Sequence, residues 1–239
     1  MKRITSGIPG LDPLLQGGYP DKSVNLLNGP PGAGKTIFAM QFLVEGAKKG
    51  EPGIYITFQE NKDTLIQEMK EFGWDLEKFE KEKKLLIFES TPEQVEKLMK
   101  EGSGIIQDVI DSLGAKRLVM DSLSTVIMLY QEGMKKRKLI LQLLKKLRQW
   151  GCTSLLIDEG SYKEDRLTIT TEEFEAEFEV DSIIKLSYDK EGTKGRERSM
   201  EILKMRSTKH PNTALPIKID DDGISIPVRQ GKLQFSTRK

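Results

Sequence analysis

The residues with the clearest capacity for chemistry form the segment "GPPGAGKT" at positions 29–36, which matches the phosphate-binding pattern G-x-x-x-x-G-K-[ST]. The glycines allow successive backbone N–H groups to point inward at phosphate oxygens. Lys35 is expected to reach the β- and γ-phosphates of a nucleotide, and Thr36 to ligate Mg²⁺. The predicted nucleotide-binding residues of this P-loop are Gly29, Pro30, Pro31, Gly32, Ala33, Gly34, Lys35, Thr36 and Ile37.

A carboxylate suited to the same metal follows the apolar segment "RLVMDS" at 117–122. Asp121 stands at the carboxyl end of this predicted strand, where α/β sheets place their ligands. The sequence therefore predicts Asp121 as the second Mg²⁺ ligand. The alternative is that Asp121 serves as a helix N-cap or turn residue.

Two cations and the only histidine of the chain lie in "ILKMRSTKH" at 202–210. Side chains alternate along a strand, so Lys204 and Arg206 are expected on one face, about 7 Å apart, with Leu203 and Met205 on the other. Together with His210, this cluster indicates an anionic target. The alternative is a strand end that carries two solvated cations and an ordinary loop histidine.

These residues require a scaffold, and apolar segments with strand character alternate with helical periodicity along most of the chain. The expected strands are 23–29, 53–58, 84–90, 117–122 and 152–159, and the expected helices are 35–50, 62–73, 92–101, 104–114 and 134–150. This alternation predicts an α/β fold with a mostly parallel sheet covered by helices on both faces. After residue 180, strands joined by short polar turns predict antiparallel additions to that sheet. No linker is evident, and one domain spanning 1–239 is expected.

Composition sets limits on the function. The chain has 239 residues, 31% of them charged, yet its formal net charge is only +1, so bulk charge does not indicate a nucleic-acid or membrane protein. Cys152 is the single cysteine, which rules out an internal disulfide. The N-terminus has no apolar signal region and no stretch approaches eighteen apolar residues. We therefore expect a cytoplasmic protein without membrane association.

Four segments together resemble KaiC-like ATPases of the RecA superfamily: "ITSGIPGLDPLLQGGYP", "IYITFQE", "RLVMDSLS" and "ILKMRSTKH". The resemblance covers nearly the whole chain and implies a RecA-like P-loop NTPase core with a twisted sheet. It also implies a homo-oligomeric ring, with six subunits as the family expectation, and ATP held between neighbouring subunits. Lys204 and Arg206 would then act in trans on the γ-phosphate of the adjacent subunit, with His210 beside that nucleotide. Ser207 departs from the family, which usually has glycine there.

The resemblance also implies a catalytic position after the strand at 53–58. Relatives often carry two adjacent glutamates there, whereas this chain has Gln59 and Glu60. A glutamate positions and polarises the attacking water, and an amide can orient the water without accepting its proton. Glu60 is predicted to act as the base, the alternative being that it begins the next helix. Neighbours on a strand face opposite ways, so both cannot reach the γ-phosphate unless the strand ends there. We therefore expect slow, Mg²⁺-dependent ATP hydrolysis.

Two functions remain open. The favoured one is a ring ATPase or ATP-gated switch that acts on an unidentified protein client. The alternative is a recombinase-like, DNA-binding repair ATPase, for which the basic helix "KKRKLILQLLKKLR" at 135–148 is the supporting feature. The strongly acidic segment "TTEEFEAEFEVD" at 170–181 argues against DNA, since its carboxylates would repel a phosphate backbone.

Overall fold

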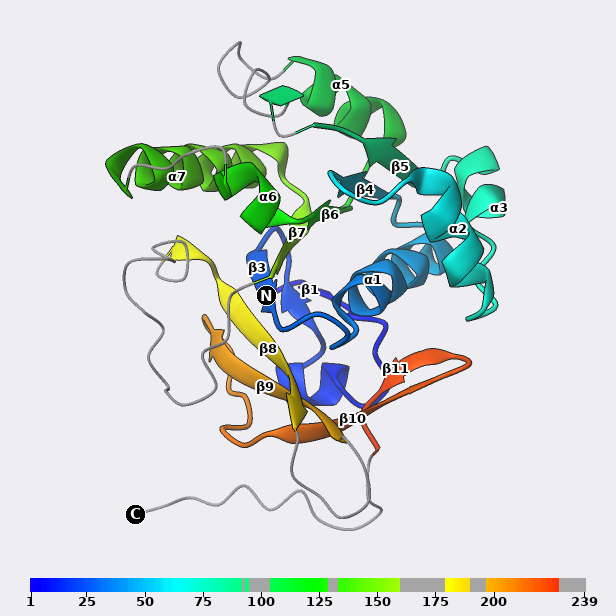
Figure 1. Cartoon of the computed structure of the whole chain (residues 1–239), viewed down its shortest axis with the longest axis vertical. Helices are drawn as coiled ribbons and strands as arrows, with labels where there is room; N and C mark the ends of the chain where they lie inside the picture. Colours follow the sequence, from blue (N-terminus) through cyan, green and yellow to red (C-terminus); the bar gives the residue numbers. More distant parts are fainter. Residues whose placement is uncertain (92, 95–103, 129–132, 160–178, 190–196, 228–239) are drawn as a thin grey trace.

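The computed structural model describes residues 1–91, 93–94, 104–128, 133–159, 179–189 and 197–227. Within them, a nine-stranded sheet has the order β11-β10-β9-β8-β3-β7-β6-β4-β5, and β1 and β2 form a separate antiparallel pair (Figure 1). The strands are β1 Arg3–Ile4, β2 Tyr19–Pro20, β3 Val24–Asn28, β4 Gly53–Thr57, β5 Leu85–Glu89, β6 Arg117–Asp121, β7 Thr153–Asp158, β8 Ser182–Asp189, β9 Glu197–Met205, β10 Leu215–Asp220 and β11 Gly223–Ser225.

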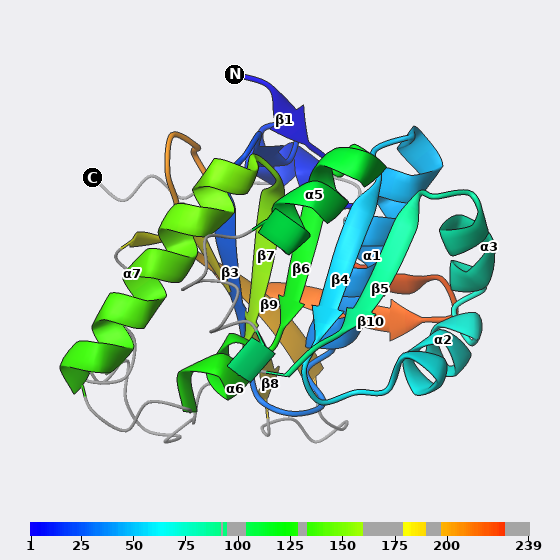
Figure 2. The same ribbon diagram turned by 90° about the horizontal axis from the view of Figure 1, so that it is seen from above.

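Helices cover both faces of this sheet. They are the 3-10 helix η1 Asp12–Leu15 and the α-helices α1 Lys35–Lys49, α2 Lys62–Lys70, α3 Leu76–Lys81, α5 Gly104–Leu113, α6 Leu123–Met128 and α7 Gly133–Trp150. Figure 2 shows α5, α6 and α7 on one side of the central strands and α1 on the other. No helix among the described residues is long and apolar enough to cross a membrane.

The core is divided by the sheet into two layers. Successive strand residues alternate between them: Leu26 and Met120 pack in the layer under α5, α6 and α7, whereas Leu27 and Val119 pack in the layer under α1. This period of two is what a sheet buried on both faces requires. The layer under α1 also holds the N-terminal segment, including Ile4 and Leu15.

The predicted α/β class, the mostly parallel sheet and the antiparallel C-terminal strands are confirmed. One detail differs, because β8 pairs parallel with β3 and the antiparallel pairing begins only at β9. The chain leaves β7 at the end of that strand and enters β8 at the opposite end of the sheet, so β8 runs in the same direction as β7. The helix expected at 92–101 lies almost wholly outside the described residues. Helices α3 and α6 were not predicted.

The strand expected to carry the two cations contains a β-bulge. Ile183 pairs with Lys204 and Ile184 with Ile202, so Leu203 has no partner in the ladder. Leu203 is 45% exposed, whereas Met205 is buried. The expectation that Leu203 and Met205 share a face was therefore wrong, because an extra residue in one strand breaks the alternation.

Candidate nucleotide site

The P-loop connects the end of β3 to the first turn of α1, as the motif requires. Gly32 and Gly34 have φ angles of 78° and 98°, a left-handed conformation that favours glycine. A side chain at Gly34 would meet Ile219 of β10 at 2.8 Å. The loop therefore packs closely against the β10–β11 hairpin, which supports its curvature from the side.

Lys35 is held inside this loop. Its side-chain Nζ donates hydrogen bonds to the carbonyl oxygens of Gly29 at 2.8 Å and Pro30 at 3.1 Å. Burial lowers the pKa of the Lys35 ammonium. The largest effects in the opposite direction are the negative charges of Glu159 and Asp121. The cation thus lies next to the backbone that would enclose a phosphate.

The structure brings the two predicted Mg²⁺ ligands together. Thr36 Oγ1 donates to Asp121 Oδ2 at 3.4 Å, and the Tyr55 hydroxyl donates to the same oxygen at 2.6 Å. Burial raises the pKa of Asp121, and the hydrogen bond from Tyr55 is the largest effect that opposes the rise. A hydroxyl and a carboxylate are oxygen ligands of the kind Mg²⁺ accepts from proteins alongside water and phosphate oxygens, so this pair fits the ion.

Gln59 and Glu60 lie just beyond β4, which ends at Thr57. Gln59 Nε2 donates to Thr125 Oγ1 at 2.6 Å, which turns the amide toward α6. The pKa of Glu60 is raised by burial and, next, by the charge of Asp121. Helix α2 begins at Lys62 with Asn61 as its N-cap, so Glu60 precedes that helix and is not its first residue. The two side chains thus have different surroundings, and Glu60 lies within the electrostatic influence of Asp121.

Sequence reasoning missed a second carboxylate at the end of β7. Asp158 is fully buried and accepts hydrogen bonds from Asn28 Nδ2, at the start of the P-loop, and from Ser124 Oγ at 2.6 Å. Ser124 in turn accepts from the backbone N–H of Glu159 at 2.9 Å. The sequence did offer a signal for this residue, because Asp158 stands at the carboxyl end of a predicted strand. This network ties the P-loop strand to the segment that follows Asp121.

Lys204, Arg206 and His210 lie at the other end of the sheet. Met205 pairs with Ser182, which pairs with Asn25 near the start of β3, whereas the P-loop follows the end of β3. A five-residue strand spans about 17 Å, so this length of sheet separates the two groups. The sheet therefore places the cations at a distance from the P-loop of their own chain. His210 Nδ1 lies 3.0 Å from the carbonyl oxygen of Pro211.

Asp181 organises the surroundings of these cations. Its Oδ1 lies 3.7 Å from Arg206 Nη1, and its Oδ2 accepts from Arg148 Nη1 at 2.8 Å and from the backbone N–H of Val24 at 2.9 Å. Lys204 has a pKa lowered by burial and, next, by Arg206. The arginine is thus oriented by an acid that is itself fixed to the central strand.

The turn after Arg206 has a left-handed backbone at Ser207. Ser207 has a φ angle of 55°, in the left-handed region that is costly for most residues other than glycine. Arg3 supports this turn by donating to the Ser207 carbonyl at 3.2 Å and to Thr208 Oγ1 at 2.7 Å. The turn that contains Ser207 is therefore held by hydrogen bonds from Arg3 of β1.

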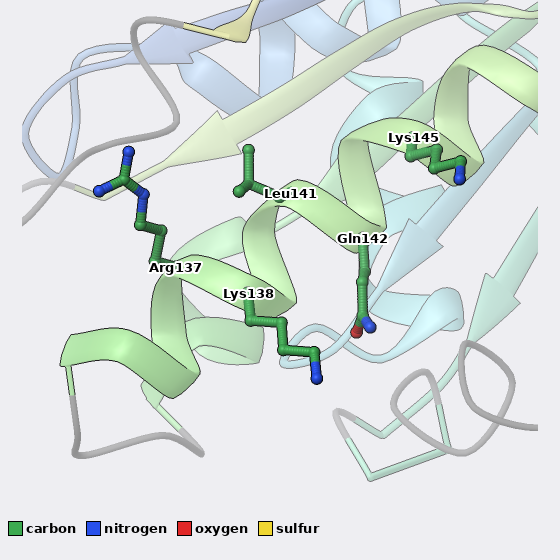
Figure 3. Close-up of a pocket in the computed structure, with 5 residues that line it drawn as sticks. All are labelled: Arg137, Lys138, Leu141, Gln142 and Lys145. Atoms are coloured by element: carbon green, nitrogen blue, oxygen red, sulfur yellow. The ribbon is translucent and has the colours of Figure 1, made fainter.

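A surface pocket lies elsewhere, on the outer side of α7. Figure 3 shows the side chains that line it, which belong to successive turns of that helix: Arg137, Lys138, Leu141, Gln142 and Lys145. Leu141 is 41% exposed and stands among these polar and basic residues. The pocket includes none of the P-loop residues.

Known proteins are similar to this chain over nearly its full length. A sequence model of the KaiC ATPase family matches residues 4–230. A UPF0273 protein of Thermotoga maritima is 34% identical, covering 97% of this chain and 98% of that protein. A UPF0273 protein of Pyrococcus furiosus is 35% identical, with 95% and 94% covered. The crystal structure of a KaiC-like protein from Pyrococcus horikoshii OT3 aligns with a TM-score of 0.81 at 36% identity, covering 95% of this chain and 99% of that one. The family model covers most of the chain, and the relatives match it over nearly their full length. The chain therefore belongs to the KaiC family of ATPases.

Proposed function

We propose that this protein is an Mg²⁺-dependent ATPase that works as a homo-oligomeric ring, hydrolyses ATP slowly and uses the nucleotide state to act on a protein client. The observation that carries the proposal is the separation of Lys204 and Arg206 from the P-loop by the length of the sheet. Two halves of a site at opposite ends of one subunit meet when subunits associate head to tail. Such heterologous contacts form a ring when the rotation between neighbours closes, and six subunits are expected here.

Each residue group has a distinct part in this site. Lys35 and the P-loop amides bind the phosphates, and Thr36 with Asp121 would hold Mg²⁺, which supplies positive charge to the β- and γ-phosphate oxygens. Glu60 accepts the proton of the attacking water. Lys204 and Arg206 of the neighbouring subunit stabilise the negative charge that develops on the transferred phosphoryl group. His210 lies beside that nucleotide.

Slow turnover follows from the pair at 59 and 60. The amide of Gln59 cannot accept a proton, and its Nε2 donates to Thr125. A slow enzyme holds ATP for long periods, which suits a switch whose bound state signals to a client.

The alternative, a DNA-binding repair ATPase, draws its support from α7. Arg137, Lys138 and Lys145 line the pocket on the outer side of that helix. A basic helix face is more often a solvated surface than a phosphate site, and the exposed Leu141 within it suits a protein contact. Fluorescence anisotropy with single- and double-stranded DNA, titrated with salt, separates the two functions. We expect no binding at physiological ionic strength; tight binding with a steep salt dependence would favour the DNA function.

Mass photometry with and without ATP, together with phosphate release measured on the same sample, tests the main proposal. We expect ATP to promote a ring and phosphate release to require both Mg²⁺ and ATP. A protein that stays monomeric with ATP at every concentration, or that releases no phosphate, would contradict it.

A further inference from the structure

Tyr55 is a buried tyrosine of β4 whose hydroxyl is directed at the metal-ligand carboxylate. Tyr55 pairs with Val119 of β6, and Thr57 pairs with Asp121. Residues two apart on a strand share a face, so Tyr55 and Asp121 both face α1, the helix that carries Thr36. The Tyr55 hydroxyl reaches across to Asp121 Oδ2 at 2.6 Å, although the tyrosine itself is fully buried.

The same carboxylate oxygen also accepts from Thr36 Oγ1 at 3.4 Å. The Tyr55 contact is the shorter of the two, and it comes from a side chain that packing holds in place. Burial and the charge of Asp121 raise the pKa of Tyr55 well above its ordinary value, so the phenol stays protonated and keeps its proton for donation. The hydrogen bond also opposes the effect of burial on the Asp121 pKa.

We propose that Tyr55 is a positioning residue for Mg²⁺: its hydroxyl fixes the orientation of the Asp121 carboxylate beside Thr36. Tyr55 acts through Asp121, which its hydroxyl contacts. This inference rests on the proposed Mg²⁺-ATP function. Without the phenol, the Asp121 carboxylate loses its shorter hydrogen bond, so the ion must order its ligand at the moment of binding.

The test is the Mg²⁺ dependence of nucleotide binding, followed by fluorescence of N-methylanthraniloyl-ATP. Tyr55→Phe removes the hydroxyl and keeps the ring. We expect its half-saturating Mg²⁺ concentration to rise at least fivefold, while nucleotide affinity measured in EDTA is unchanged. Mn²⁺ should show the same ordering of wild type and variant.

Tyr19→Phe is the matched control. Tyr19 is also buried, at 1% exposure, and its hydroxyl has no hydrogen-bond partner among the described residues. Removing that hydroxyl should leave the Mg²⁺ dependence at the wild-type value. A second arm introduces Tyr55→Phe into an Asp121→Asn chain, where the phenol has no carboxylate to fix. In that chain, Tyr55→Phe should cause no further rise in the half-saturating Mg²⁺ concentration.

The outcomes separate this inference from the function on which it rests. A wild-type protein that binds no nucleotide with Mg²⁺ would contradict the proposed function itself. A wild type that binds, with Tyr55→Phe and Tyr19→Phe equal in their Mg²⁺ dependence, would overturn only the role of Tyr55. A Tyr55→Phe chain that fails to fold, beside a folded Tyr19→Phe chain, would also overturn it, because the hydroxyl would then be a structural requirement.

Discussion

Two carboxyl groups beside the P-loop, those of Glu60 and Asp121, have raised pKa values. In each case burial is the largest cause of the rise. In the proposed mechanism, Glu60 acts as a base and Asp121 as a metal ligand, and both roles require the ionised carboxylate. Lowering the pH protonates both groups sooner than it would protonate ordinary surface carboxylates.

The rate of hydrolysis should therefore fall as the pH decreases. The fall should occur at pH values above the usual pKa range of carboxyl groups. The sign follows because the active form is the deprotonated one and its pKa is raised. A profile of kcat/KM against pH measures where the rate falls, and the stability of the folded protein is checked at each pH. A rate that stays flat down to the ordinary glutamate range, near pH 4–5, would contradict the assignment of both residues.

Lys35 is the residue on which nucleotide binding should depend most. Its charge-assisted contacts with phosphate are worth about 1.5–3 kcal/mol, so Lys35→Ala should weaken ATP binding at least tenfold. Calorimetric titration measures the affinity. Lys49→Ala, at the far end of the same helix where Lys49 pairs with Glu45, serves as the control and should bind normally. Unchanged affinity in Lys35→Ala would remove the P-loop assignment.

The pair at 59 and 60 sets the rate. We expect wild-type turnover below about one per second, faster turnover in Gln59→Glu because a second carboxylate can accept the proton, and none in Glu60→Gln. Phosphate release under saturating Mg²⁺-ATP measures all three. A wild-type rate above about ten per second, or no response to either substitution, would dismiss these residues and leave the nucleotide site in place.

At the scale of elements, one buried arginine joins three parts of the chain. Arg117 begins β6 and is fully buried. It donates to Glu51 Oε2 at 2.6 Å, to the Thr5 carbonyl at 2.8 Å and to the Phe42 carbonyl at 2.7 Å. Its guanidinium also lies 4.6 Å from the centre of the Phe42 ring. The N-terminal segment is thereby fixed to α1 and to the strand that ends in Asp121.

Arg117→Met should lower the free energy of unfolding by about 3–5 kcal/mol, since it leaves buried carbonyl oxygens and a carboxylate without a donor. Glu51→Gln keeps an acceptor for the guanidinium and should cost only about 1 kcal/mol. Urea denaturation of the two variants beside wild type measures the difference. Equal, small losses would mean that the network contributes little to the attachment of the N-terminal segment.

The sequence predicted the elements with strong periodicity and missed what depends on distant partners. The P-loop, β6 with Asp121 and the long α7 were predicted because their signals are local. The bulge at Leu203 was not, since it appears only in the pairing of β9 with β8. Tyr55 and Asp158 were missed for the same reason: their significance comes from hydrogen bonds to Asp121 and Asn28 on neighbouring strands, which no spacing within one segment shows.

At the scale of the whole molecule, the sheet places the two residue groups of the proposed site at its opposite ends. The phosphate loop and the metal-ligand pair lie at one end of the sheet, and Arg206, oriented by Asp181, lies at the other. The exposed Leu203 in the bulge beside Arg206 adds apolar surface at that end. A subunit alone is expected to bind ATP and to hydrolyse it poorly.

Mixing two inactive variants tests this arrangement most directly. Arg206→Ala keeps an intact P-loop, and Lys35→Ala keeps an intact arginine, so each alone should release almost no phosphate. In an equal, random mixture, about a quarter of the head-to-tail interfaces combine both intact halves, and activity should recover to about that fraction of the wild-type rate. Native mass spectrometry of one isotopically labelled variant confirms that the rings are mixed. No recovery at any ratio, in rings shown to be mixed, would contradict a site shared between neighbouring subunits.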